Sequence, residues 1–438
     1  MISLSRAISV IGTGYVGLVT GTGLADFGNR VVCADINEEK IAMLNSGQIP
    51  IYEPGLKELV DKNVRESRLS FTTDVDKAIR KAEVVFIGVG TPPKENGEAD
   101  LSCVENVAES IASNLNSHKT VVIKSTVPIG TNRLIKRIIS EKSGRDDFDI
   151  VSNPEFLREG RAVHDFFHPD RVVVGYESEA AKDVVQDIYK VLYLLETPFL
   201  FCNLETAELI KYASNAFLAT KITFINQIAN LCEILGADVH KVAKGMGMDG
   251  RISPKFLHPG PGYGGSCLPK DARALVNMGD KNSVDMSLVR EVIESNEKQK
   301  IRMVDKLESL LGGLSCRRIA VLGLSFKAGT DDIRESPSLY VIGELLRRGS
   351  IVVVHDPEAM SRAKAALDDK VEYGENEYET IRGCDGILLI TEWNQYRGLD
   401  LKLARELMKG NVLLDARNLL DPEDARTAGF LYEGIGRR

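Results

Sequence analysis

One cysteine near the middle of the chain lies in a setting that suits a nucleophile. Cys267 follows a run of glycines in PGPGYGGSCLPKD, and Lys270 and Asp271 come shortly after it. Glycines let a backbone turn tightly around a ligand, and a nearby ammonium favours the reactive thiolate over the thiol. A lone cysteine is more often a small buried hydrophobic residue, but the glycines and the Lys-Asp pair favour a nucleophile here.

Two polar residues share one face of a predicted helix. Lys211 and Asn215 are four residues apart in ELIKYASNAF, which places an ammonium and a carboxamide on the same side. Ile210, Phe217 and Leu218 nearby are apolar, so the pair lies at the edge of a core. A surface lysine and a solvated asparagine are the alternative, but this setting favours two groups that point at one ligand.

Further polar residues follow predicted strand ends. Glu155 and Glu159 stand after one such end in NPEFLREG, the usual position of site residues in an open α/β sheet. On the residues alone, solvated glutamates are the favoured interpretation. Ser125 and Thr126 in KSTVPIGT have hydroxyls that either contact a ligand or cap a helix.

A glycine-rich turn near the N-terminus is typical of dinucleotide binding. Gly12, Gly14 and Gly17 form GTGYVG between a predicted strand and a predicted helix. This spacing permits a tight turn, close approach of the backbone to a pyrophosphate and close packing of helix on strand. The N–H groups at the start of the helix are then available to the anion.

The residue at the end of the next strand indicates which cofactor binds. Asp35 lies roughly 20 residues beyond the turn, where a carboxylate accepts hydrogen bonds from the adenosine ribose. A 2'-phosphate would meet a like charge there, and Ile36 and Asn37 supply no arginine. We therefore expect NAD and not NADP. The alternative is a packing turn with a solvated Asp35.

The order of predicted elements indicates an α/β fold of two Rossmann-like, doubly wound domains joined by a central all-helical domain. Strands alternate with helices at both ends of the chain, and the middle has long helical patterns. The predicted strands are 7–11, 30–34, 84–89, 120–124, 149–151, 318–322, 351–355, 386–390 and 412–414, and the main predicted helices are 15–27, 205–235 and 285–311. The domains expected are 1–203, 204–312 and 313–438. The first turn of the third domain, GLSFKAG, lacks GxGxxG, so we expect it to bind a different nucleotide.

The bulk composition excludes several classes of protein. A chain of 438 residues with 43% hydrophobic residues and a net charge of -8 is expected to fold throughout and not to hold nucleic acid as its main task. No segment has the roughly 18 consecutive apolar residues of a membrane span, and no signal peptide pattern is present. The seven cysteines lack metal or disulfide spacing, so we expect no metal and a cytosolic location.

The set of motifs resembles the UDP-glucose/GDP-mannose dehydrogenase family. GTGYVG, PIYEPGL, GTP at 90–92, STVPIGT, NPEFLREG, the Lys211 helix, GYGGSCLPKD and FKAGTDDIRES occur in the family's order, from Ile8 to about Asp421. PIYEPGL and RISPKFLHPGPGYGG are most similar to the bacterial UDP-glucose 6-dehydrogenases. GGSCLPKD is shared with GDP-mannose dehydrogenases, whereas dehydrogenases of N-acetylated UDP-sugars usually differ after the cysteine.

The resemblance implies a four-electron oxidation of the sugar CH2OH of UDP-glucose to a carboxylate, with two NAD molecules used in turn. Cys267 would be the nucleophile that retains the aldehyde as a thiohemiacetal and then a thioester. Lys211 and Asn215 would stabilise oxyanions, with a base role for Lys211 left open. Asp271 would hold a water with Thr126, and Glu155 would act as a base in hydrolysis.

The resemblance also implies binding residues for both ligands. Those for NAD would be Gly12, Gly14, Tyr15, Val16, Gly17, Asp35, Lys40, Thr91, Thr126, Glu159, Lys270 and Arg334. Those for the UDP-sugar would be Glu155, Phe156, Leu157, Lys211, Asn215, Arg251, Phe256, Leu257, Tyr263, Gly264, Phe326, Lys327 and Arg417. Arg251 would reach the substrate of a neighbouring subunit, which implies a homodimer or a higher homo-oligomer.

Three other functions compete with this expectation. A GDP-mannose 6-dehydrogenase would use the same mechanism. A two-electron hydroxyacid or 6-phosphogluconate-type dehydrogenase shares a nucleotide domain followed by a helical domain, but it has no use for GGSC or a third α/β domain. A non-catalytic nucleotide sensor is the alternative from a different class, because a fold alone does not establish activity.

Overall fold

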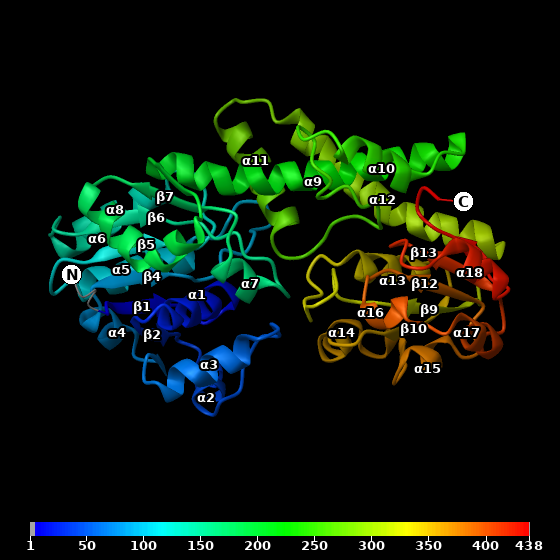
Figure 1. The fold of residues 1–438 in the computed structure, drawn as a ribbon, viewed down its shortest axis with the longest axis horizontal. Coiled ribbons are helices and arrows are strands. Elements are labelled where there is room, and N and C mark those ends of the chain that lie inside the picture. The colour runs from blue at the N-terminus through cyan, green and yellow to red at the C-terminus, as the bar shows by residue number, and fades with distance from the viewer. Residues whose placement is uncertain (1–4, 438) are drawn as a thin grey trace. The chain divides into compact units, whose positions relative to one another are not determined.

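The structure is a computed structural model that describes residues 5–437, and the chain divides into two compact units, 1–213 and 214–438. The first unit is built on an eight-stranded sheet with the order β3-β2-β1-β4-β5-β6-β7-β8 (Figure 1). Its strands are β1 (Ala7–Ile11), β2 (Arg30–Ala34), β3 (Leu69–Thr72), β4 (Val84–Ile87), β5 (Thr120–Ile123), β6 (Asp149–Ser152), β7 (Val172–Tyr176) and β8 (Phe199–Cys202).

Helices cover both faces of this sheet. They are α1 (Tyr15–Asp26), α2 (Glu38–Asn45), α3 (Leu56–Arg65), α4 (Val75–Lys81), α5 (Ser102–Ser113), α6 (Thr131–Ser143), α7 (Ala162–Phe167), α8 (Glu179–Ile188) and the short η1 (Lys190–Leu195). Along β1, Val10 packs into one hydrophobic core with α1 and α3, and Ile11 packs into a second core with α4, α5 and α6. This alternation of the strand side chains makes the sheet doubly wound, as predicted.

The last two strands, β7 and β8, depart from the predicted parallel arrangement. β7 pairs with β6 in the antiparallel direction, with Val151 opposite Tyr176 and Ser152 opposite Gly175. The chain between these two strands carries the NPEFLREG loop and the six-residue α7, and it returns along the neighbouring position in the opposite direction. The other paired strands of the sheet are parallel.

The long helix α9 (Leu204–Leu235) begins in the first unit and continues into the second. In the second unit it is followed by α10 (Val239–Gly247), α11 (Leu268–Lys281) and α12 (Ser287–Leu311). The predicted helices 205–235 and 285–311 therefore match α9 and α12 within two residues at each end. Gly312, in the left-handed region at φ 67°, ends α12 as a glycine C-cap does.

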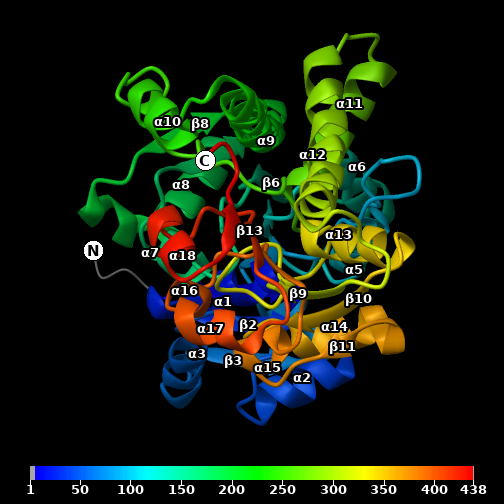
Figure 2. The same cartoon turned by 90° about the vertical axis from the view of Figure 1, so that its right-hand side faces the viewer.

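A six-stranded parallel sheet with the order β11-β10-β9-β12-β13-β14 forms the rest of the second unit (Figure 2). Its strands are β9 (Arg318–Leu322), β10 (Ile351–His355), β11 (Glu372–Tyr373), β12 (Gly386–Leu389), β13 (Val412–Asp415) and β14 (Leu431–Glu433). Its helices are α13 (Pro337–Arg347), α14 (Met360–Leu367), η2 (Asp368–Lys370), α15 (Glu377–Ile381), α16 (Asn394–Arg397), α17 (Leu401–Leu407) and α18 (Pro422–Thr427).

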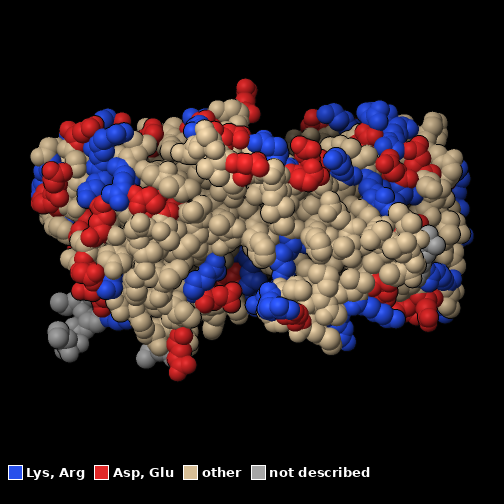
Figure 3. Space-filling model, turned by 90° about the horizontal axis from the view of Figure 1, so that it is seen from above, with Lys and Arg blue, Asp and Glu red and all other residues tan. Residues whose placement is uncertain are grey.

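The helical segment and this second sheet share one hydrophobic core. Ile225 of α9 and Val304 of α12 belong to the same buried cluster as Val321 of β9 and Val354 of β10. The fold class predicted from the sequence, two Rossmann-like sheets with a helical segment between them, is confirmed. Within residues 5–437, no helix combines the length and the apolar character that crossing a membrane requires. Acidic and basic side chains are interspersed on the face shown in Figure 3.

Candidate active site

The first glycine turn is tightly packed at two positions and open at the third. A Cβ on Gly12, whose φ is 101°, would lie 2.7 Å from the Gly88 carbonyl oxygen, and one on Gly17 would lie 2.0 Å from the Gly12 oxygen. A Cβ on Gly14 would meet no atom within 4 Å. Gly14 also precedes α1 without a side-chain cap, so the first N–H groups of α1 suit an anion. This turn fits the pyrophosphate of a dinucleotide.

Asp35 follows β2 directly and is tied to the glycine turn. Its Oδ2 accepts hydrogen bonds from the Thr13 backbone N (2.7 Å) and Oγ1 (2.8 Å), and its Oδ1 accepts one from the Asn37 N (2.9 Å). Burial opposes ionisation, but these hydrogen bonds and the charge of Lys40 outweigh it and lower the pKa of Asp35. Asp35 is therefore a carboxylate at neutral pH, as ribose recognition requires.

Two predicted cofactor residues meet at the ends of β4 and β5. The Thr91 hydroxyl, which is 7% exposed, donates to the Thr126 carbonyl oxygen at 2.8 Å. Ser125, one residue earlier, uses its hydroxyl to donate to the Val89 carbonyl at 2.6 Å. The Ser125 side chain therefore holds two loops together, while Thr126 stays partly exposed.

A buried glutamate joins three of the sequence motifs. The Glu53 carboxylate, in PIYEPGL, accepts hydrogen bonds from the Gly160 N and the Ala162 N, each at 2.7 Å. The Tyr15 hydroxyl, in GTGYVG, accepts from the same Gly160 N at 2.7 Å. Helix α7 has no cap of its own, so Glu53 caps it from a distance. Sequence reasoning missed this role, because no local pattern links residue 53 to residue 160.

Glu155 is buried, and the interpretation of a solvated glutamate is wrong. The Lys211 Nζ donates to the Glu155 carboxylate (2.9 Å) and to its carbonyl oxygen (2.7 Å), and both side chains are at most 5% exposed. The Leu157 N donates to the second carboxylate oxygen at 2.5 Å. A long helix brings Lys211 over the NPEFLREG loop, which the residues alone do not reveal. Paired in this way, both charges are tolerated in the interior.

Phe156 lies between cations. Its ring centroid is 5.3 Å from the Lys211 Nζ and 3.5 Å from the Arg171 guanidinium carbon. These distances are those of cation–π contacts. Glu159 in the same loop is partly exposed.

The second unit places Cys267 at the start of a helix. Cys267 is the N-cap residue of α11, and its half-buried Sγ lies 3.6 Å from the Ser266 hydroxyl. The positive end of the helix dipole favours a thiolate at this position. From the sequence, the Lys270 ammonium was expected to favour the thiolate of Cys267, but this ammonium forms an ion pair with Asp271 at 2.7 Å. The helix terminus is the better-supported source of activation.

Asp271 binds two other predicted site residues. Its carboxylate is 1% exposed and accepts from the Lys270 Nζ at 2.7 Å and from the Asn215 Nδ2 at 2.6 Å. Since Asn215 lies on α9 and Asp271 lies one turn after Cys267 on α11, this carboxylate fixes α11 against α9. Lys211 and Asn215 are on successive turns of α9, as the spacing predicted.

The glycines before Cys267 are positions of close packing against the protein. A Cβ on Gly262 would lie 2.8 Å from the Asn296 Oδ1, one on Gly264 would lie 2.3 Å from the Glu335 carbonyl, and one on Gly265 would lie 2.7 Å from the Phe326 ring. The Gly265 N also donates to the Arg334 carbonyl at 3.0 Å. The glycine loop before Cys267 therefore packs closely against the FKAGTDDIRES segment, and Phe326 of that segment lies beside the loop.

Carboxamides from α9 and α12 hold the same loop. The Asn226 Oδ1 accepts from the Gly260 N at 2.8 Å, and the Gln299 Nε2 donates to the Gly260 carbonyl at 2.9 Å. Asn296 makes both bonds to the backbone of Tyr263, at 2.8 and 3.1 Å. Sequence reasoning missed these residues, because amides scattered along a helix carry no recognisable spacing. The Tyr263 ring itself packs among Ala219 and Val292, and Leu257 is 3% exposed in the main core.

The second Rossmann-like sheet uses its acidic strand end differently. Asp356, after β10, is 1% exposed and accepts from the Leu324 N (2.7 Å), the Ser325 N (3.0 Å) and the Trp393 Nε1 (3.1 Å). Asp35 in the first unit is partly exposed. The carboxylate of Asp356 is already bound by groups of the protein, so it is not available to a ribose. This supports the expectation that the second Rossmann-like sheet binds a different nucleotide.

Three predicted substrate residues gather at the carboxyl ends of β9, β12 and β13. The Arg417 guanidinium donates to the Ile390 carbonyl (2.9 Å) and to the Phe326 carbonyl (3.1 Å). The Lys327 Nζ lies 5.4 Å from the Phe326 ring centroid. Arg334 is 60% exposed and pairs with Asp332 at 2.7 Å.

Arg251 stands apart from these groups. Its side chain is 90% exposed and bonds to Asp249 of its own loop at 2.6 Å. Phe256, a few residues later, has φ 64°, an uncommon conformation for a bulky residue. Among residues 5–437, no three His, Cys, Asp or Glu side chains are grouped as a metal ion requires.

Known proteins with similar sequences cover the whole chain. A UDP-glucose 6-dehydrogenase of Bacillus subtilis is 48% identical over 99% of this chain and 93% of its own length, and one from Rhizobium meliloti is 48% identical over 98% and 99%. The structure of a UDP-glucose dehydrogenase from Pyrobaculum islandicum superposes with a TM-score of 0.94 at 41% identity, covering 100% of this chain and 99% of the other.

Three domain models of one family match consecutive parts of the sequence. The NAD-binding domain matches residues 6–193, the central domain matches 205–298 and the UDP-binding domain matches 320–422. The NAD cofactor expected from Asp35 is thereby confirmed, and the three matches follow the order of the motifs along the chain. This chain belongs to the UDP-glucose/GDP-mannose dehydrogenase family.

Proposed function

We propose that the chain is an NAD-dependent UDP-glucose 6-dehydrogenase that converts UDP-glucose into UDP-glucuronate. The observation that carries this proposal is Cys267 at the N-terminus of α11, one turn from an Asp271 that holds Lys270 and Asn215. The relatives with 48% identity over nearly the full length are named for this activity. A nucleophile is unnecessary for a two-electron dehydrogenase, so its presence favours the four-electron reaction.

The overall reaction has a fixed balance. One R–CH2OH, one water and two NAD+ give one R–COO–, two NADH and three protons. Each NAD accepts one hydride, and four electrons leave the sugar carbon in two steps. An aldehyde exists between the steps, and the protein must keep it from escaping.

Cys267 retains the aldehyde. Its sulfur forms a bond to the aldehyde carbon and gives a thiohemiacetal. The carbon of this thiohemiacetal still has a hydrogen that can leave as a hydride. Oxidation of that carbon leaves a thioester. Attack by water then breaks the C–S bond, releases the carboxylate and returns the thiol. The helix terminus beneath Cys267 stabilises the thiolate both as the attacking and as the leaving group.

Charged and polar groups on α9 and nearby loops serve the other steps. Lys211 and Asn215 stabilise the oxyanions, for which fixed donors are worth about 10² to 10³ in rate each. Glu155, buried against Lys211, is the base in hydrolysis, and Asp271 and Thr126 hold the water. Lys211 acts as an oxyanion donor and not as a base, because it pairs with a carboxylate that favours the ammonium form.

Each part of the chain has its own binding task in this proposal. Residues 1–203 bind NAD, 204–312 provide the nucleophile and the subunit contact, and 313–438 bind the UDP-sugar. The NAD contacts are those of the glycine turn and Asp35, with Lys40, Thr91, Thr126, Glu159, Lys270 and Arg334. The UDP-sugar contacts are Glu155, Phe156, Leu157, Lys211, Asn215, Arg251, Phe256, Leu257, Tyr263, Gly264, Phe326, Lys327 and Arg417. The seven cysteines are free thiols, which fits a reducing, cytosolic environment.

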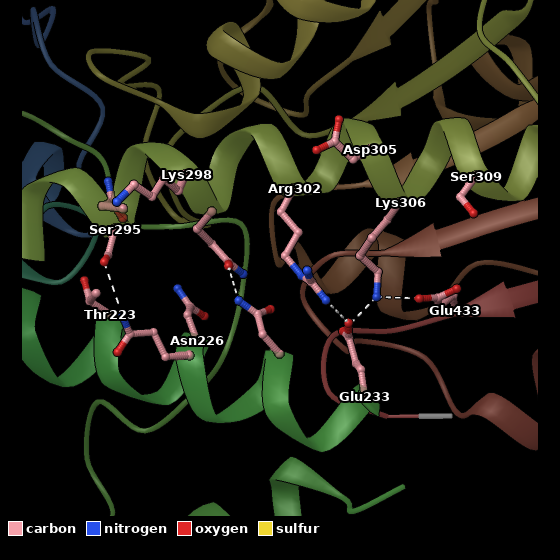
Figure 4. A pocket seen from close by; sticks show the side chains of 14 residues that line it. Thr223, Asn226, Glu233, Ser295, Lys298, Arg302, Asp305, Lys306, Ser309 and Glu433 are labelled. Carbon is pink, nitrogen blue, oxygen red and sulfur yellow. Dashed lines mark hydrogen bonds and ion pairs between the residues drawn. The ribbon is translucent and has the colours of Figure 1, made fainter. Parts of the chain in front are cut away.

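The chain acts as a homodimer. Phe217, Phe224 and Leu231 on α9 are 65%, 45% and 50% exposed, and their spacing of seven places them on one helix face. Such an exposed apolar row is typical of a subunit contact. A polar groove of about 530 Å³ lies between α9 and α12 and is lined by Thr223 and Asn226 of α9 and by Ser295 and Lys298 of α12 among others (Figure 4). In this arrangement the exposed Arg251, which pairs with Asp249 in this chain, would reach the substrate of the partner.

The deciding experiment is NADH formation by the purified protein with UDP-glucose, GDP-mannose and UDP-N-acetylglucosamine. Two NADH per UDP-glucose consumed, with UDP-glucuronate as product, are expected. One NADH per sugar would replace the proposal with a simple alcohol dehydrogenase, and a preference for GDP-mannose would overturn the substrate. Binding of the nucleotides without any NADH would show a sensor and not an enzyme.

A further inference from the structure

A second buried lysine lies behind the Lys211–Glu155 pair and has no part in the mechanism above. Lys124 follows β5 directly and is 7% exposed. Its Nζ donates to the Asn153 Oδ1 at 2.9 Å and to the Tyr189 hydroxyl at 3.3 Å. Burying an ammonium costs several kcal/mol unless nearby groups offset the loss of water. The fold keeps this cation inside.

Lys124 is tied to the turn that carries Glu155. Asn153 precedes Glu155 by two residues, and its backbone N donates to the Ile123 carbonyl at 2.9 Å. The Asn153 side chain accepts from Lys124 and from the Tyr189 hydroxyl (2.9 Å) and donates to the Val173 carbonyl (2.8 Å). The network is 0–7% exposed, so the orientation of the turn depends on all its members.

The charges of Glu155 and Lys211 also act on the Lys124 ammonium. The titratable groups that face it are Glu155, Lys211 and Tyr189. Burial lowers the pKa of Lys124 to about 8, the charge of Glu155 acts against this, and the charge of Lys211 adds to it. Burial also raises the pKa of Tyr189, which therefore stays neutral. The ammonium of Lys124 is thus lost as the pH rises through about 8.

We propose that Lys124 is a positioning residue for the oxidation: its ammonium orients the Asn153–Glu155 turn and keeps the buried Lys124, Glu155 and Lys211 at a net positive charge. This inference rests on the proposed function. A net positive charge favours the anionic oxygens that form during the reaction. When Lys124 is neutral, the three residues have no net charge, and this stabilisation is lost.

The test compares Lys124→Met with a matched control, Lys119→Met. Lys119 is also buried, at the other end of β5, but its Nζ donates to the Ala82 carbonyl at 2.7 Å, and the charged neighbour that lowers its pKa is Arg145. We expect Lys124→Met to lower kcat about 10- to 100-fold, less than the loss of a direct donor. Its KM for NAD should stay unchanged, and its kcat–pH profile should lose the alkaline limb near pH 8 that the titration of Lys124 produces. Lys119→Met should keep the wild-type pH profile.

Two further variants keep the proposal testable if Lys124→Met does not fold. Tyr189→Phe removes the hydroxyl that accepts a hydrogen bond from the Lys124 ammonium, so the pKa of Lys124 should fall. The alkaline limb of the kcat–pH profile, expected near pH 8, should therefore move to lower pH. In Lys124→Arg the side chain stays charged above pH 8, so the alkaline limb of the kcat–pH profile should move to much higher pH. A folded Lys124→Met with the wild-type kcat and pH profile would overturn the proposal, as would a limb that stays in place in both other variants.

A readout without turnover separates this proposal from the proposed function. NMR titration of the lysine side chains follows Lys124 directly. We expect its pKa to fall in Glu155→Gln, which removes an attractive charge, and to rise in Lys211→Met, which removes a repulsive one. No response to either change would refute the charge coupling. Absence of NADH with every sugar nucleotide would instead refute the proposed function, and the titration would still decide the coupling.

Discussion

In the proposed mechanism, the reactivity of Cys267 comes from the position of this residue at the start of a helix. As the N-cap of α11 it lies at the positive end of a helix dipole, whereas the lysine three residues later is neutralised by Asp271. A buried thiol such as Cys33 has the opposite character, because burial raises its pKa to about 12. Two cysteines of one chain thus differ through their surroundings alone.

Replacing the nucleophile should stop the reaction after the first oxidation. In Cys267→Ser we expect the formation of free acid to fall on the order of 10³-fold or more, because a hydroxyl is a far weaker nucleophile and a poorer leaving group. Binding of NAD should be unchanged in a fluorescence titration. The exposed Cys103→Ser is the matched control and should turn over normally. Full acid production by Cys267→Ser would contradict the covalent route.

Asp35 should determine both the affinity for NAD and the exclusion of NADP. Asp35→Ala removes a charged acceptor, and hydrogen bonds to such groups are worth about 1.5–3 kcal/mol, or roughly 10- to 100-fold in Kd. NADP should bind relatively better, since the like charge is gone. Isothermal titration with both cofactors measures this. Since Asp35 also holds Thr13, Thr13→Ala controls for the turn. An unchanged ratio of the two Kd values would speak against Asp35 as the discriminating group.

At the scale of elements, α9 combines chemistry at one end with structural contacts at the other. Lys211 and Asn215 lie near its start, and Glu233 lies in its last turn. The Glu233 carboxylate binds the Lys306 Nζ (2.7 Å), Arg302 (2.6 Å) and the Gly436 N (2.9 Å), as Figure 4 shows for the two side chains. It therefore fixes α9 to α12 and to the C-terminal segment.

Loss of the Glu233 charge should destabilise the fold in a pH-dependent way. Burial alone would raise the pKa of Glu233. Hydrogen bonds from Lys306 and the Gly436 N, together with the neighbouring charges, outweigh burial, so the pKa of Glu233 lies below its usual value. Its stabilising contribution is thus complete above the unfolded pKa of about 4.3 and disappears as the pH falls through the lower folded pKa. We expect Glu233→Gln to cost about 2–4 kcal/mol at pH 7. Urea unfolding should show this cost shrinking below pH 4; the same cost at every pH would contradict a charge-based contribution.

At the scale of the whole molecule, the proposed dimer rests on the exposed apolar row on α9 and on the exposed Arg251. The row offers a surface whose burial stabilises association, and Arg251, which is 90% exposed, pairs with Asp249 of its own loop.

Mixed dimers test this arrangement. Arg251→Ala and Cys267→Ala should each be nearly inactive alone. After joint unfolding and refolding in equal amounts, half of the dimers are mixed and carry one complete site, so about a quarter of the wild-type activity should return. No recovery would mean that Arg251 serves its own subunit. Light scattering of Phe224→Glu should show monomers, and a persistent dimer would place the contact elsewhere.

The sequence by itself determined the order of elements and the local devices of the site. The turn from Gly12 to Gly17, the bounds of α9 and α12, and the shared face of Lys211 and Asn215 all follow from local spacing, because helix and strand periods and glycine conformations act over a few residues. The cofactor also followed, since Asp35 stands at a fixed distance after the turn.

Tertiary structure alone decided which distant groups meet. It buried Glu155 under Lys211, capped α7 with Glu53, paired Lys270 with Asp271 and set Lys124 behind the pair. It also placed β7 and β8 antiparallel to the other six strands of the first sheet. These outcomes join residues up to about a hundred positions apart, and the free energy of a buried charge depends on partners that no local pattern specifies.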